Sequence, residues 1–120
     1  ESRLGVLTTS GCYAAGQKAF HYKDDTSLRR IPSDTPVEKL RFSHITENYL
    51  VDARRDPDCL VPLTALQAEI AAGRLGGLTD SVLSCMGGVY SQRRVQAEMI
   101  PEIAATFANE GADAVLLIPM

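Results

Sequence analysis

Two aliphatic runs near the two ends of this sequence constrain its fold more than any other feature. One covers residues 3–9 (RLGVLTT) and the other covers residues 114–120 (AVLLIPM). Apolar runs of this length are typical of strands buried on both faces of a parallel sheet. In open α/β sheets the functional site lies just beyond the carboxyl ends of such strands, and the second run stops there. We therefore expect residues 1–120 to form a single α/β domain that is part of a longer subunit.

Further strand patterns lie between these runs. Residues 40–45 alternate apolar and polar side chains, residues 81–86 form a third strand pattern, and residues 27–31 are expected to form a short extended piece. Residues 48–58 are polar and predict a surface loop. Strands that alternate with helices predict a parallel sheet of about four strands with flanking helices and right-handed crossovers. The expected architecture is Rossmann-like or flavodoxin-like, and incomplete.

The helix signals are capping residues, glycine stops and one internal proline. Pro101 lacks an amide proton and clashes with the preceding turn, so we expect a kink or break near Ile100. Three helices are predicted: a short one capped by Thr35, one from Pro62 to Gly73, and the longest from its N-cap Ser91 to Gly111.

Charge and cysteine content exclude several classes of protein. Twelve Lys and Arg against fifteen Asp and Glu give a net charge of -3, which argues against nucleic-acid binding. The apolar runs are far shorter than the roughly 18 residues of a membrane span. The three widely spaced cysteines (Cys12, Cys59 and Cys85) predict a reducing, cytoplasmic location rather than disulfides. With two His and three Cys and no local pairing, we expect no metal site.

Small and polar residues follow three of the expected strands. Because the carboxyl ends of parallel strands meet at one rim, these segments are expected to form a binding site there. The turn after the first strand lacks the full G-x-G-x-x-G spacing, so a dinucleotide site is not supported. The expected substrate-binding residues are Thr9, Ser10, Gly11, Ser43, Met86, Gly87 and Gly88.

Cys12 and His44 are the candidate catalytic residues. Backbone N–H groups around Cys12 would lower the pKa of its thiol; alternatively, Cys12 is a small side chain that fills a turn. His44 would bind a substrate carboxylate or shuttle a proton; alternatively, it bonds to a neighbouring loop. Cys59 and Cys85 are expected in the core, and His21 in solvent.

Several short stretches occur together over nearly the whole chain: LTTSG at 7–11, RIPSDT at 30–35, Ser43-His44, DPDCLVPL at 56–63, GRLGGL at 73–78, Met86-Gly87-Gly88 and EGADAVLLIP at 110–119. In this order and at about this spacing, they resemble the selenoprotein B family of glycine, sarcosine, betaine and D-proline reductases. The resemblance implies an enzyme that cleaves a C–N bond reductively as part of a complex, acting on a small amine or amino acid.

The resemblance also implies groups that residues 1–120 lack. A selenocysteine or cysteine in a [Sec/Cys]-x-x-Cys motif is expected after Met120, and a pyruvoyl group on a partner chain is implied for the glycine and D-proline systems. Other reductase subunits or a second copy are the implied partners, and they would cover open sheet edges. Two alternatives remain: a non-catalytic α/β binding or assembly subunit, and a racemase-like or lyase-like enzyme that uses the thiols of Cys12 and Cys85.

Overall fold

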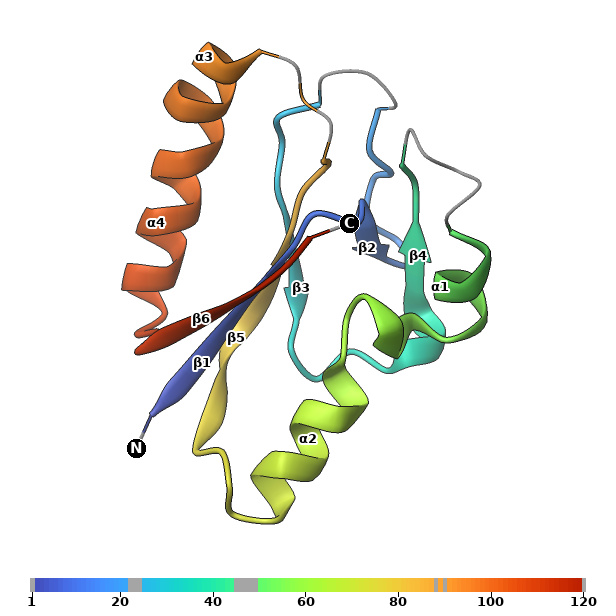
Figure 1. Cartoon of the computed structure of the whole chain (residues 1–120), viewed down its shortest axis with the longest axis vertical. Coiled ribbons are helices and arrows are strands. Elements are labelled where there is room, and N and C mark those ends of the chain that lie inside the picture. Colours follow the sequence, from blue (N-terminus) through green and yellow to red (C-terminus); the bar gives the residue numbers. More distant parts are fainter. Residues whose placement is uncertain (1, 22–24, 45–49, 88, 90, 120) are drawn as a thin grey trace.

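A four-stranded sheet forms the centre of the computed structural model, which describes residues 2–21, 25–44, 50–87, 89 and 91–119 (Figure 1). The strand order is β3-β5-β1-β6. Strand β1 pairs in parallel with β5 and β6, whereas β3 is antiparallel to β5. The expected α/β fold is confirmed, with a sheet that is mixed and mostly parallel. The strands are β1 (Arg3–Thr8), β3 (Arg29–Pro32), β5 (Gly77–Ser84) and β6 (Ala114–Ile118).

Successive side chains of strand β1 point to opposite faces of the sheet, and each face packs against a different layer. On one face helix α4 (Ile100–Asn109) approaches so closely that a Cβ at Gly5 would lie 2.6 Å from the Phe107 ring. On the other face Val6 is buried in the main core. Glycine at position 5 is therefore what allows the helix to lie against the sheet.

The main core lies between the Val6 face of the sheet and a second group of elements. These are the antiparallel pair β2 (Cys12–Ala14) and β4 (Leu40–Phe42) and the helices α1 (Val51–Arg55) and α2 (Leu63–Ala71). The buried core residues are Val6, Cys12, Ile31, Leu40, Phe42, Leu50, Ala53, Val61, Leu63 and Val82.

Two expectations for the middle of the chain are wrong. Residues 40–42 do form a strand, but β4 pairs with β2 outside the main sheet, and the fourth strand of that sheet is instead β3. The surface loop expected over residues 48–58 contains α1 and the 3-10 turn η3 (Pro57–Cys59), with Ala53 buried. Residues 45–49 lie outside the described part.

The long helix predicted over residues 91–111 continues through the position where a kink or break was expected, but its hydrogen-bond pattern changes just before Pro101. It consists of α3 (Gln92–Arg94), a π-helical segment η4 (Val95–Met99) and α4. The Ser91 side chain accepts a hydrogen bond from the Arg94 amide, which confirms Ser91 as the cap.

The cap predicted at Thr35 is wrong. Pro36 precedes the 3-10 turn η1 (Val37–Lys39), and the Thr35 hydroxyl donates to the Pro32 carbonyl instead. Threonine hydroxyls readily form hydrogen bonds with nearby backbone groups. The bond to the Pro32 carbonyl takes the place of the expected cap at the start of the helical turn.

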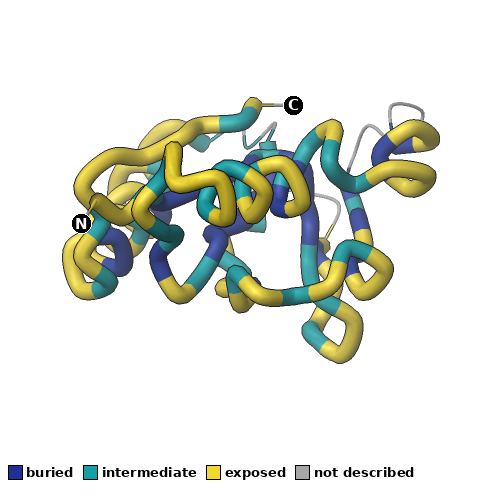
Figure 2. The backbone as a smooth tube through the Cα atoms, turned by 90° about the horizontal axis from the view of Figure 1, so that it is seen from below, coloured by how far each residue is buried: buried dark blue, intermediate teal, exposed yellow. Residues whose placement is uncertain are grey.

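No described helix is long and apolar enough to cross a membrane. The expectation that residues 114–118 are buried on both faces is wrong: the residues of β6 are largely exposed, because among the described segments only β1 pairs with this strand, and Figure 2 shows this exposure in the segment that leads to the C-terminus.

Candidate functional site

The structure brings the three predicted strand-end segments together in one cluster. The Ser43 amide donates to the Gly11 carbonyl at 3.0 Å, and Ser10 forms an isolated bridge with Met86. The Gly87 amide donates to the Thr9 carbonyl at 3.1 Å. The six described members therefore share one rim of the sheet. Gly88 lies outside the described residues.

Gly11 is the residue on which this convergence depends. Its φ of 70° lies in the left-handed region, which favours glycine. A Cβ there would collide with the Ser43 carbonyl oxygen and lie 3.0 Å from the Met86 sulfur. The close passage of residues 43 and 86 past the turn thus requires the absence of a side chain.

His44 is buried in this cluster, with 5% of its surface exposed. Its Nε2 accepts a hydrogen bond from the Gly87 amide at 3.2 Å. A nitrogen that accepts a hydrogen bond carries no proton, so the other ring nitrogen, Nδ1, holds the proton of the neutral imidazole. In this arrangement His44 positions the Gly87 turn.

The cluster is closed rather than open. Ser10, Gly11, His44 and Met86 are buried, and the Gly11 amide already donates to the Cys85 carbonyl. The Gly87 amide serves both Thr9 and His44. These two N–H groups, which the sequence suggested as donors to a ligand, are thus bonded within the protein; a substrate-binding role for the cluster stays a prediction.

The surroundings of Cys12 do not favour the expected activation of its thiol. Burial raises the pKa of its thiol to about 12, which outweighs the opposing effect of a hydrogen bond with the Arg41 backbone. Burial also raises the pKa of Cys85 to about 11. Cys85 is buried as predicted, but Cys59 is exposed because Val61, two residues on, fills the core instead. The two-thiol alternative loses its chemical basis, since both thiols are buried and protonated near neutral pH.

An open cleft of about 960 Å³ lies between residues 18–21 and 25–29 on one side and the α3–α4 helical segment on the other. Three of its lining side chains are cationic and three are anionic, and His21 is exposed at it, as predicted. The cleft adjoins the strand-end cluster, because Phe20 lines it and the Phe20 carbonyl accepts a hydrogen bond from the Ser43 hydroxyl at 3.3 Å. The charged lining residues are Lys18, Asp25, Arg29, Arg94, Glu98 and Glu102.

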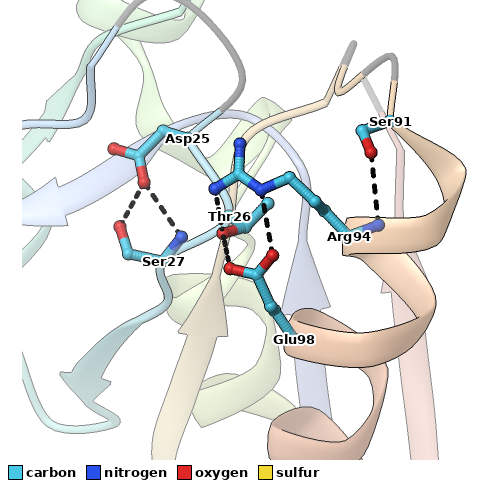
Figure 3. Close-up of polar contacts among 6 residues, drawn as sticks. All are labelled: Asp25, Thr26, Ser27, Ser91, Arg94 and Glu98. Atoms are coloured by element: carbon cyan, nitrogen blue, oxygen red, sulfur yellow. Dashed lines mark hydrogen bonds and ion pairs between the residues drawn. The ribbon is translucent and has the colours of Figure 1, made fainter.

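A polar network spans the cleft between Thr26 and the helical segment (Figure 3). Arg94 donates to Glu98 at 2.9 Å and to the Thr26 hydroxyl at 3.1 Å, and that hydroxyl donates to Glu98. Hydrogen bonds from Arg94 and Thr26 lower the pKa of Glu98. Glu98 lies on the π-helical segment η4, a departure from α-helix that is frequent at functional sites.

The other wall of the cleft is fixed by Arg29 and Asp25. The Arg29 guanidinium stacks 4.3 Å from the centre of the Phe20 ring and donates to the Lys18 and Ala19 carbonyls. Burial works against ionisation of Asp25, but hydrogen bonds from Ser27 and from the His21 amide outweigh it and lower the pKa of its carboxyl group. Both charges are therefore held in the wall.

Sequence reasoning missed this cleft. Residues 18–29 follow neither a helical nor a strand pattern in the sequence, so no pattern indicated that charged side chains of this stretch would face a helix. The one available signal was the spacing of Arg94 and Glu98, which at i and i+4 share a helix face. Within the described ranges, no group of three or more His, Cys, Asp or Glu side chains could hold a metal ion.

Comparison with known proteins gives one relationship. This chain is 31% identical to "D-proline reductase subunit gamma" of Acetoanaerobium sticklandii. The match extends over 114 residues, which make up 95% of this chain. The chain is a distant homologue of that subunit. It spans 47% of the relative, which is about half its length. No protein-family model matches the sequence, and no solved structure matches it.

Proposed function

We propose that this chain is a component of a reductase that cleaves a C–N bond in a small amine or amino acid. The observation that carries the proposal is the homology to a D-proline reductase subunit along 95% of the chain. The substrates considered are D-proline, glycine, sarcosine and betaine. Cleavage takes up two electrons and two protons, which a dithiol that becomes a disulfide supplies.

The charged cleft supports a substrate of this kind. A zwitterion carries one carboxylate and one ammonium group, and the cleft offers three cations and three carboxylates in its lining. A polyanion would gain little from a balanced lining, because attraction and repulsion offset each other. We infer that the substrate binds in the cleft, with its carboxylate toward Arg94 or Lys18 and its ammonium group toward Glu98 or Asp25.

The strand-end cluster has a positioning role in this proposal. Gly11, Ser43 and Gly87 hold three loops together, and His44 fixes the Gly87 turn through its Nε2. Cys12 is not the nucleophile, because burial raises the pKa of its thiol to about 12. The selenol or thiol that the family resemblance implies after Met120 would be the nucleophile, and in the glycine and D-proline systems a pyruvoyl group on another subunit would hold the substrate amine.

A second candidate is a subunit that binds substrate or assembles the complex without reacting itself. The state of the three thiols favours it: burial raises the pKa of Cys12, Cys85 and also Cys59, where nearby aspartates add to the effect. The complex turns over substrate under both candidates, which differ in whether this chain itself supplies a reacting group.

The test uses a tagged form of the chain, purified with its partners from the cells that produce it. The complex is incubated with a dithiol and each of the four substrates, and loss of substrate and formation of the ring-opened or deaminated product are measured. Turnover of at least one substrate is expected. Turnover that the cleft variants below leave unchanged would favour the assembly subunit, and turnover of none of the four substrates would overturn the proposal.

Cleft variants then locate the substrate. Arg94→Gln and Glu98→Gln each remove a charge from the cleft and should raise the substrate concentration for half-saturation about tenfold, as expected for one charged hydrogen bond. Arg93→Gln is the matched control, because Arg93 is exposed on the same short helix but does not line the cleft. Equal effects of Arg93→Gln and Arg94→Gln would remove the cleft from the proposal.

A further inference from the structure

Thr26 joins the two walls of the cleft through a single hydroxyl group (Figure 3). That hydroxyl accepts a hydrogen bond from the Arg94 guanidinium and donates one to the Glu98 carboxylate, each at 3.1 Å. Thr26 is buried, with 8% of its surface exposed, whereas the side chains of Arg94 and Glu98 are 36% and 48% exposed. A buried group on one wall therefore holds two partly exposed charged groups on the other.

The ion pair of Arg94 and Glu98 depends on this contact for a fixed geometry. A partly exposed pair at i and i+4 on a helix gains little energy, because two long side chains lose rotational freedom when they are held in one arrangement. One hydroxyl that bonds to both partners fixes the guanidinium relative to the carboxylate. It has to accept from one group and donate to the other, and among side chains of this size only a hydroxyl does both.

The backbone on both sides of this contact is held by further hydrogen bonds. The Asp25 carboxylate accepts from the His21 amide at 2.8 Å and from the Ser27 amide at 2.9 Å. Asp25 and Ser27 flank the bridging threonine, so these bonds fix the turn that presents its hydroxyl. On the other wall the Ser91 hydroxyl accepts from the Arg94 amide at 3.3 Å. Both walls are therefore ordered by contacts of their own.

We propose that Thr26 is a positioning residue, whose hydroxyl holds Arg94 and Glu98 in the orientation that binds the carboxylate and the ammonium group of a zwitterionic amino acid. This inference rests on the proposed function, which places the substrate in the cleft, and it selects these two charges from those considered there. A guanidinium binds a carboxylate through N–H groups in one plane, so a fixed plane favours binding. Side chains that are already ordered also lose less freedom when a ligand binds.

The pair of Arg94 and Glu98 matches the charges of an α-amino acid. In such a molecule the carboxylate and the ammonium group are attached to one carbon atom, so they are best bound by two opposite charges that lie side by side. The Arg94 Nε and a Glu98 carboxylate oxygen are 2.9 Å apart. With the substrate carboxylate at Arg94 and its ammonium group at Glu98, the four charges alternate in sign, and each is next to an opposite charge.

The first test measures the positioning without substrate, through the titration of Glu98. Hydrogen bonds from Arg94 and then from Thr26 lower the pKa of Glu98, and the charges of Arg94 and Arg93 act in the same direction. Thr26→Val keeps the shape of the side chain but removes the hydroxyl, so the pKa of Glu98 should rise. Thr26→Ser keeps the hydroxyl and should keep the original pKa. Carbon NMR of the Glu98 carboxyl group in the whole protein follows the titration, and circular dichroism checks that both variants fold.

The charges of the cleft are the same in the original protein and in both variants, so a difference in this titration reports the hydroxyl. An unchanged pKa of Glu98 in Thr26→Val would overturn the proposal.

The second test uses the complex purified with its partners. Thr26→Val should raise the substrate concentration for half-saturation about tenfold and leave the rate at saturation unchanged, whereas Thr26→Ser should stay within about twofold of the original. Thr106→Val is the matched control, because Thr106 is also buried and its hydroxyl accepts from an arginine, Arg30, but it does not line the cleft.

Half-saturation that is the same in Thr26→Val as in the original would overturn the proposal, and so would an equal rise in Thr106→Val, which would assign the effect to lost stability. Turnover of none of the four substrates would overturn the proposed function instead. The titration of Glu98 would still show whether Thr26 positions the ion pair, so the two failures are distinguished.

Discussion

The substitution Gly11→Ala tests the convergence of the strand-end segments most directly. It adds a methyl group at a residue with a φ of 70°, pointed at the Ser43 carbonyl oxygen and 3.0 Å from the Met86 sulfur. The obstacle is backbone, which cannot rotate away as the end of a flexible side chain can. We therefore expect the Gly11 turn and residue 43 to separate in the variant.

The magnitude has two parts. Holding alanine in the left-handed region costs about 1–2 kcal/mol. Separating the two segments weakens the hydrogen bond between the Ser43 amide and the Gly11 carbonyl, which contributes about 0.5–1.5 kcal/mol, and disturbs the packing around it. The free energy of unfolding should fall by about 2–4 kcal/mol.

Gly73→Ala is the matched control. Gly73 has a φ of 78°, but nothing lies within 4 Å of a Cβ at that position. The control therefore bears only the backbone cost, about 1–2 kcal/mol. Equilibrium unfolding in urea, followed by circular dichroism, gives both values. If Gly11→Ala is no more destabilising than Gly73→Ala, the close approach of Ser43 to Gly11 is wrong.

Three further predictions concern the thiols and His44. In the folded chain a water-soluble thiol reagent should label the exposed Cys59, and it should reach the buried Cys12 and Cys85 only after denaturation. Mass spectrometry of the labelled peptides shows which thiols react. Labelling of Cys12 before denaturation would contradict its burial. Burial raises the pKa of Cys12 to about 12 and of Cys85 to about 11, so these thiols stay protonated when folded but ionise near 9.0 when unfolded. The free energy of unfolding should therefore hold below about pH 9 and fall toward pH 11 by up to about 1.4 kcal/mol per pH unit for each thiol, a slope that Cys12→Ala should reduce. For His44, nitrogen NMR should find the proton on Nδ1 in the neutral form, and a proton on Nε2 would exclude the bond from the Gly87 amide.

Much of the sheet could be predicted from the sequence, because β1 and β6 are aliphatic runs that few other structures accommodate. The pairing of the shorter strands could not. The alternation of Leu40 and Phe42 correctly indicates a strand with one buried face, but a three-residue strand carries no information on its partner. Helix α1 was missed because Ala53 is its one buried residue, too little for a helical pattern.

The candidate site, like the sheet, could be predicted only in part from the sequence. The rule that parallel strands direct their following loops to one rim correctly grouped Gly11 and Gly87. Ser43 joins them for a different reason, because β4 pairs with β2 outside the main sheet and the Ser43 amide donates to the Gly11 carbonyl. The rule could not show that the N–H groups of Gly11 and Gly87 bond within the protein, since that depends on how closely the loops approach. Nor could it show the cleft, because the wall formed by residues 18–21 and 25–29 is held by side-chain hydrogen bonds rather than by a repeating pattern.

The closed cluster and the open cleft should respond differently to substitution. The cluster is buried and joined by backbone hydrogen bonds, so a change there alters the position of whole loops. The cleft is lined by side chains on residues 18–21 and 25–29 and on the α3–α4 segment, most of which are not in the core. Substitutions at exposed cleft residues such as Lys18 or Glu102 should therefore change ligand preference at little cost in stability, whereas substitutions in the cluster should affect stability first. The Phe20 carbonyl, which accepts from Ser43, is the link through which a shift in the cluster would reach the cleft.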